Sequence, residues 1–111
     1  MQNSEETIYF NFNEMVLSEE DKKMLDKTIK KLKSDINKNV TLTGFTDNIG
    51  TKTNNMEAAN ARARAARQHL LDNGIKRSRI TIYGYGEVMF KGDNSTEEGR
   101  ALNRRVEVSY Q

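Results

Sequence analysis

The hydrophobic positions of this chain change period along its length, and the changes predict strands separated by helices. In the segment 7–12, Ile8, Phe10 and Phe12 occupy alternate positions, which is typical of a strand with one buried face. After residue 18 the apolar residues recur at helical spacing, and lysines fill the remaining positions, so an amphipathic helix follows. Its predicted buried stripe consists of Leu25, Ile29, Leu32 and Ile36.

The first helix has a recognisable start, and a second strand and helix follow it. Ser18 and Asp21 approximate a capping box, in which each side chain bonds the backbone of the other. The segment 40–45 alternates again and predicts a strand. A second helix is predicted over about 55–73, and its small inner residues let it lie close to a sheet. Its predicted stripe comprises Ala59, Ala63, Ala66 and Leu70, with Met56 near the start and Gly74 suited to the left-handed position after the end.

The last third of the chain predicts two more strands. One begins at Ile80 and gives way to a loop at Gly84 and Gly86. A short helix over 96–102 and a final strand over 105–110 follow. The order is β-α-β-α-β-(short α)-β. We therefore predict an α/β fold, namely a two-layer sandwich of a mixed four-stranded sheet with helices on one face.

Composition limits the possible functions. The chain has 111 residues, which suits one domain, and a net charge of +2, which is too weak to indicate a nucleic-acid partner. Arg62 shares its helix with Arg64 and Arg67, but these two lie on a different side. The sequence contains no cysteine, and no apolar run approaches the roughly 20 residues that cross a bilayer. We expect no metal, no cofactor and no membrane insertion of this domain.

The most distinctive chemistry follows the second strand. Asp47 lies in a polar loop that leads to the second helix, and Arg62 lies within that helix. A carboxylate and a guanidinium a few ångströms apart fit a zwitterion, because one accepts from an ammonium and the other grips a carboxylate. Unpaired amides near Asn54 and Asn55, at the predicted helix start, would add donors. The alternative is an ordinary structural ion pair between Asp47 and Arg62.

Three stretches in this order carry a resemblance to a known family. They are "GFTDNIG" at 44–50, the pattern of Asn55, Ala59, Ala61, Arg62 and Ala63, and "GRALNRRVEV" at 99–108. Together they resemble the C-terminal domain of outer membrane protein A, the OmpA-like peptidoglycan-binding family. Peptidoglycan-associated lipoproteins and flagellar stator proteins share this domain. The resemblance covers nearly the whole chain and implies one such domain over 1–111.

The resemblance implies a ligand and a set of site residues. In the family, the positions of Asp47 and Arg62 bind the meso-diaminopimelate of the peptidoglycan stem peptide. The positions of Thr46 and Asn55 line the pocket, and those of Arg104 and Arg105 support that side of the domain. Because these two arginines flank a strand start, we expect one to support the site and the other to be exposed. The sequence departs from the family pattern at Phe45, where histidine is common, and at Ala58, so the pocket wall is expected to differ.

We therefore predict a noncatalytic module that anchors an envelope protein noncovalently to peptidoglycan, on the periplasmic side of the cell envelope. The full-length protein is expected to be associated with the outer membrane. Two alternatives remain open: a protein–protein or stator-type module with the same fold, and a peptidoglycan hydrolase. The hydrolase is disfavoured because Glu87, Asp93 and Glu97 show no pattern of tuned catalytic carboxylates.

Overall fold

The sheet of this protein contains four strands in the order β1-β4-β2-β3. The structure is a computed structural model that describes residues 6–10, 14–86 and 90–111. The strands are β1 (Glu6–Tyr9), β2 (Val40–Phe45), β3 (Ile80–Gly86) and β4 (Arg105–Tyr110). β4 runs antiparallel to both of its neighbours, whereas β2 and β3 are parallel. The predicted mixed sheet is thus confirmed.

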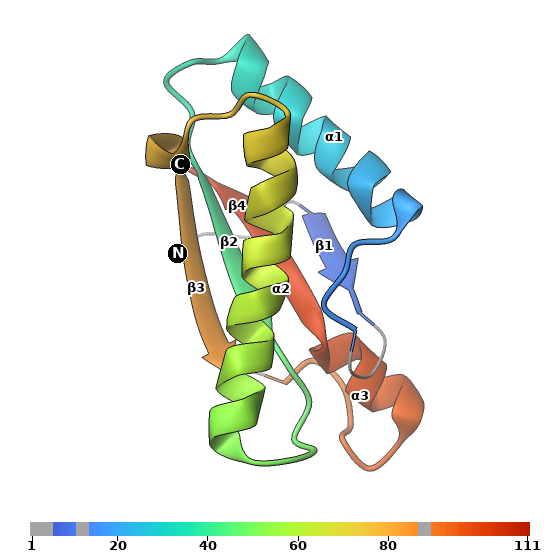
Figure 1. Cartoon of the computed structure of the whole chain (residues 1–111). Helices are drawn as coiled ribbons and strands as arrows, with labels where there is room; N and C mark the ends of the chain where they lie inside the picture. The colour runs from blue at the N-terminus through green and yellow to red at the C-terminus, as the bar shows by residue number, and fades with distance from the viewer. Residues whose placement is uncertain (1–5, 11–13, 87–89) are drawn as a thin grey trace.

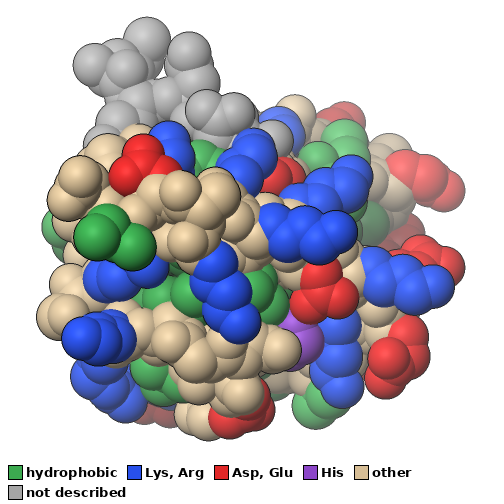
Figure 2. Space-filling view, turned by 90° about the horizontal axis from the view of Figure 1, so that it is seen from above, with side chains coloured by type: hydrophobic (Ala, Val, Ile, Leu, Met, Phe, Trp, Pro, Cys, Tyr) green, Lys and Arg blue, Asp and Glu red, His purple; other side chains and the backbone are tan. Residues whose placement is uncertain are grey.

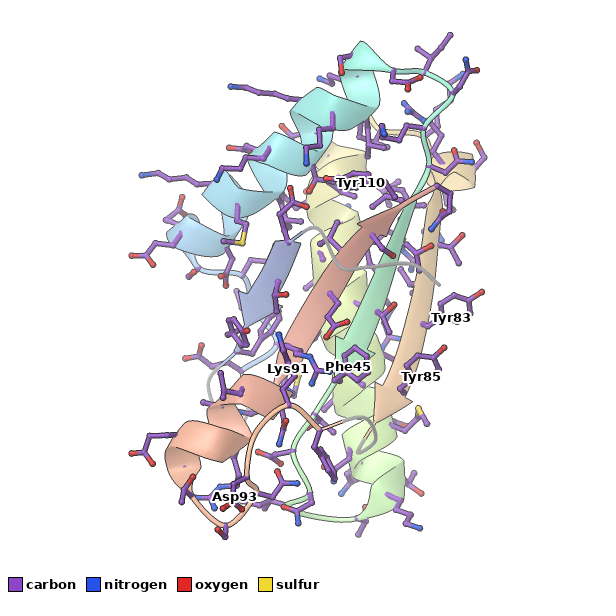
Figure 3. The ribbon with its side chains drawn as sticks, turned by 180° about the vertical axis from the view of Figure 1, so that it is seen from behind. Phe45, Tyr83, Tyr85, Lys91, Asp93 and Tyr110 are labelled. Atoms are coloured by element: carbon purple, nitrogen blue, oxygen red, sulfur yellow. The ribbon has the colours of Figure 1, made fainter. Side chains whose placement is uncertain are left out.

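The helices are α1 (Glu19–Ser34), α2 (Lys52–Asp72) and α3 (Glu97–Asn103), with a 3-10 turn, η1 (Arg77–Arg79), before β3. Both long helices lie on the same face of the sheet (Figure 1). Seen from behind, the other face is not covered by either of them, and Phe45, Tyr83 and Tyr85 lie on it (Figure 3). This arrangement confirms the two-layer α/β prediction.

Helix α1 starts where the sequence predicts but ends earlier. The capping box is present: the Asp21 amide donates to Ser18 Oγ at 3.1 Å, and the Ser18 amide donates to Asp21 Oδ2 at 3.2 Å. The helix stops at Ser34, so the prediction that Ile36 belongs to its buried stripe is wrong. Ile36 lies beyond the cap residue Asp35 and is 79% exposed.

Helix α2 begins three residues before the predicted start, because Thr51 caps it through a bond from the Asn54 amide to Thr51 Oγ1. Met56 is 42% exposed, and Asn55 takes the buried place at this end of the stripe, so the prediction that Met56 belongs to the buried stripe is wrong. The predicted alanines are buried, and Ala59 lies so close to the sheet that a Cβ on Gly44 would collide with its carbonyl oxygen. α2 therefore packs on β2 almost backbone to backbone.

Strand β3 continues through the two glycines that were predicted to open a loop. Gly84 pairs with Gly44, and Gly86 pairs with Phe45 across a register shift. The strand persists because its parallel neighbour β2 still offers backbone partners there. The predicted first strand also named Phe12, which lies outside the described residues. Gly74 has a φ of 90°, as its predicted place after α2 requires.

One apolar core lies between the sheet and the two long helices. β2 and β4 contribute Val40, Leu42, Val106 and Val108, each fully buried, and α1 contributes Leu25 and Leu32. The far end of the molecule, where α1 and α2 finish, carries many Lys and Arg side chains on its surface (Figure 2). The opposite end, where β2 and β4 meet the loop before α2, contains buried polar residues instead. The candidate site is at that end.

Candidate functional site

A pocket of about 210 Å³ opens at the C-terminal end of β2, beside the start of β4. Residues of the loop from β2 to α2 line one side of it, and residues of α2 line another. Figure 1 shows this loop leading from the end of β2 into α2. The lining residues are Met15, Thr46, Asp47, Ile49, Gly50, Asn54, Asn55, Ala58, Arg62 and Arg104. Five of the six site positions named from the family resemblance are in this set, all except Arg105, so the fold brings these five together around one cavity.

Asp47 is held rigidly in this pocket and is only 2% exposed. Its Oδ1 accepts a hydrogen bond from the Ile49 amide at 3.0 Å, which shapes the loop as an Asx turn. Its Oδ2 accepts from Arg104 Nη1 at 2.8 Å. Both bonds fix the carboxylate in place, and its two oxygens can still accept hydrogen bonds from further donors.

Arg62 is a buried cation whose described partners are all neutral. It is 1% exposed, and its Nε donates to the Glu14 carbonyl oxygen at 3.0 Å, while Nη1 donates to Thr46 Oγ1 at 3.3 Å. Burial and, to a smaller extent, the charge of Arg104 lower the pKa of Arg62 to about 10, although the charge of Asp47 opposes this shift. The guanidinium stays charged at neutral pH and lines the pocket.

Arg104 sits between two carboxylates and is 1% exposed. Nη1 donates to Asp47 Oδ2 at 2.8 Å, Nη2 donates to Glu97 Oε2 at 2.6 Å, and Nε donates to the Phe10 carbonyl oxygen at 2.9 Å. Burial alone would lower the pKa of Arg104, but the bonds and charges of Glu97 and Asp47 together raise it. Arg104 is thus a fixed element of the wall.

The structure corrects three sequence-based expectations. The ion pair of Asp47 is formed with Arg104 rather than Arg62, since Arg62 turns its donors to Thr46 and Glu14. The amides of Asn54 and Asn55 are not free donors, because both bond to Thr51 in the cap of α2. The earlier start of the helix, at Lys52, places them inside its first turn.

The third correction concerns Arg105, because neither arginine of the "NRR" segment is exposed. Arg105 is 2% exposed, pairs with Glu107 at 2.7 Å, and lies 3.9 Å from the ring centroid of Phe45. Phe45 lies on the uncovered face of the sheet (Figure 3) and does not line the pocket. Of the two departures from the family pattern, only Ala58 lines the pocket.

Sequence reasoning missed two residues that build the site. The sequence pattern gives no sign that Glu97 is tuned, yet its hydrogen bond with Arg104 lowers the pKa of the Glu97 carboxyl. The seven-residue spacing from Glu97 to Arg104 spans two helical turns and was the available signal. Asn103 is fully buried and holds the loop before α3 through bonds from the amides of Lys91 and Gly92. That loop sets the position of α3 and hence of Glu97.

Within the described ranges, no helix has both the length and the apolar character needed to cross a membrane. In the same residues, no group of three or more acidic, histidine or cysteine side chains is arranged to hold a metal ion.

Comparison with known proteins shows the family. The model of the OmpA family matches residues 9–104, and the chain belongs to this family. Outer membrane porin F of Pseudomonas fluorescens is 47% identical over 73 residues, which are 66% of this chain and 22% of that protein. Peptidoglycan-associated lipoprotein of Pseudomonas putida is 34% identical over 92% of this chain and 61% of its own length. The chain therefore spans only part of these relatives.

Solved structures show the same fold. The peptidoglycan-associated lipoprotein from Burkholderia pseudomallei has a TM-score of 0.88 and 25% identity, covering 95% of this chain and 89% of its own. The C-terminal domain of Helicobacter pylori MotB has a TM-score of 0.84 over 96% of this chain and 85% of its own. Its 20% identity supports the shared fold alone.

Proposed function

We propose that this domain binds peptidoglycan noncovalently by holding the free end of meso-diaminopimelate in the pocket. Arg62 would grip the carboxylate of that end, and Asp47 would accept from its ammonium. Thr46 and Asn55 would line the site, and Arg104 would hold Asp47 in place. Relatives named as a peptidoglycan-associated lipoprotein and as peptidoglycan-binding protein ArfA of Mycobacterium tuberculosis support the ligand class.

The observation that carries this proposal is the environment of Arg62. A guanidinium that is 1% exposed and has only neutral described partners is costly to bury. An incoming carboxylate would give Arg62 a negatively charged hydrogen-bond partner of its own. Asp47 stands on the same cavity, so a ligand with an ammonium beside its carboxylate matches both walls.

The chemistry of the pocket supports a binding role rather than hydrolysis. Among its described lining residues, Asp47 is the single carboxylate, and it is engaged by Arg104. Glycosidases of the common kind need two carboxylates across a cleft. We propose that the domain is noncatalytic, acts on the periplasmic side of the cell envelope and anchors a larger protein to the wall. Many weak contacts with a polymer give retention through effective concentration.

The test is sedimentation with insoluble peptidoglycan of the diaminopimelate type. Wild-type protein is expected in the pellet, and Arg62→Gln in the supernatant. Arg64→Gln is the matched control, because it removes the same charge from an exposed position of the same helix. Wall with lysine at the same stem position lacks the second carboxylate and should retain little protein. Equal retention of Arg62→Gln and Arg64→Gln would rule out the proposed site.

A further inference from the structure

A second carboxylate, that of Glu97, contacts the buried guanidinium of Arg104 just behind the pocket wall. Arg104 Nη2 donates to Glu97 Oε2 at 2.6 Å, while Arg104 Nη1 donates to Asp47 Oδ2 at 2.8 Å. The Arg104 side chain is 1% exposed, and that of Glu97 is 59% exposed. One buried cation is therefore shared by an inner carboxylate that lines the pocket and an outer one at the surface.

This sharing determines the charge that a ligand meets. The set contains two guanidiniums, Arg62 and Arg104, and two carboxylates, Asp47 and Glu97, so its formal charge is zero. If Glu97 were neutral, the charge would be +1, and Asp47 alone would have to balance Arg104. Because the inner groups are buried, such a charge is poorly screened by water. The pocket would then attract an incoming ammonium less strongly. Its attraction for a carboxylate without an amine would not be weakened.

We infer that Glu97 is a positioning and specificity-determining residue, which keeps Asp47 available to an ammonium by taking up part of the charge of Arg104. This inference rests on the proposed function, since it concerns the ligand of the same pocket. Glu97 does not touch the ligand; it acts through Arg104. The ligand class it selects is an α-amino acid end that carries both charges, over a carboxylate without an amine.

A purely mechanical role for Glu97 is the competing explanation. Glu97 is the first residue of α3, and its contact with Arg104 also braces that helix against the site. The substitution Glu97→Gln separates the two roles, because glutamine keeps an oxygen acceptor of the same reach but loses the charge. Glu98→Gln is the control, because Glu98 lies in the same first turn of α3, is exposed, and has no ion pair in the part of the chain that the structure describes.

The probes are meso-diaminopimelate and pimelate, which share a seven-carbon dicarboxylate chain and differ only in the amines. Each is titrated into the labelled domain by two-dimensional NMR, which also shows that every variant is folded. The quantity of interest is the ratio of the two Kd values. We expect wild type and Glu98→Gln to prefer diaminopimelate equally, and Glu97→Gln to reduce that preference on the order of fivefold.

Every other outcome overturns the inference in a distinguishable way. An unchanged ratio in Glu97→Gln, with wild type still preferring diaminopimelate, removes the role of Glu97 and leaves the proposed function standing. An equal loss of affinity for both probes in Glu97→Gln shows that Glu97 only holds α3 in place and does not determine specificity. If the wild-type domain binds neither probe at millimolar concentration, the diaminopimelate proposal fails, and the inference fails with it.

Discussion

Asp47 and Arg104 are separated by 57 positions in the sequence, yet their side chains meet at 2.8 Å and are only 3% and 1% exposed. This buried pair joins the end of β2 to the start of β4. It means that the carboxylate of the candidate site is fixed before any ligand arrives. Preorganisation of this kind reduces the cost of binding, because no side chain has to be ordered when the ligand enters.

Asp47→Asn should therefore affect stability as well as binding. It leaves Arg104 buried with one carboxylate instead of two, so we expect the free energy of unfolding to fall by about 1–3 kcal/mol. Urea denaturation followed by circular dichroism measures the change. Glu57→Gln, at an exposed position of α2, is the control and should shift it by less than about 0.5 kcal/mol. Equal stability of wild type and Asp47→Asn would show that the pair contributes nothing to the fold.

Much of the fold could be predicted from the sequence because its signals are local. The capping box at Ser18, the alternation in β2 and the alanine stripe of α2 each depend on residues within a few positions. Helix ends were less predictable: Thr51 extends α2 backward, and Asp35 stops α1 before Ile36. The position of each helix end depends on which residue caps it. Several polar residues near each end could act as the cap, so the sequence does not single one out.

The contacts inside the site could not be predicted in the same way. Sequence reasoning placed Asp47 and Arg62 together, and the structure does put both on one cavity. It named Arg62 as the possible ion-pair partner of Asp47 and could not show that Arg104, 57 positions away, takes that place. That choice is made by the antiparallel pairing of β2 with β4, which sets Phe45 opposite Arg105. Long-range register decides the partner, and it is not visible in local patterns.

The Glu97–Arg104 contact should make stability depend on pH. The hydrogen bond and the charge of Arg104 lower the pKa of Glu97 in the folded state. A lowered carboxyl pKa gives stability that is present above the unfolded pKa, about 4.3, and is lost as the pH falls through the folded value. Wild type should therefore exceed Glu97→Gln in stability at pH 7, and the difference should shrink in acid.

The stability of wild type and of Glu97→Gln is compared through their urea denaturation midpoints at neutral pH and near pH 3. Glu98→Gln, in which no such contact is removed, should show a small difference from wild type that changes little between the two conditions. A gap between wild type and Glu97→Gln that is as large in acid as at neutral pH would contradict the electrostatic explanation.

Close packing of α2 on the sheet predicts an ordering of two glycine substitutions. A Cβ at Gly44 would meet the backbone carbonyl of Ala59, whereas at Gly84 it would meet mainly the Asn60 side chain, which can rotate away. We expect Gly44→Ala to cost about 2–3 kcal/mol and Gly84→Ala clearly less. Thermal unfolding of both variants tests the order. If Gly84→Ala proved the more damaging, the contact between β2 and α2 would be looser than described.

The proposed role of Arg62 predicts how the domain responds to the chemistry of the wall. Amidation of the free diaminopimelate carboxylate removes the negative charge that Arg62 would bind. It leaves the ammonium group, which would still bind Asp47. A charge-assisted hydrogen bond is worth about 1.5–3 kcal/mol, so the amidated stem peptide should bind wild type at least about tenfold more weakly. Calorimetric titration with the two peptides measures this ratio.

The same two peptides, titrated into Arg62→Gln, complete a double-mutant cycle. If Arg62 contacts that carboxylate, Arg62→Gln should bind both peptides with similar, weak affinity. The variant lacks the guanidinium that would distinguish the carboxylate from its amide. Arg64→Gln, which lies outside the pocket, should keep the wild-type ratio. If Arg62→Gln still discriminates tenfold between the peptides, another group reads the carboxylate, and the buried guanidinium of Arg62 serves the fold instead.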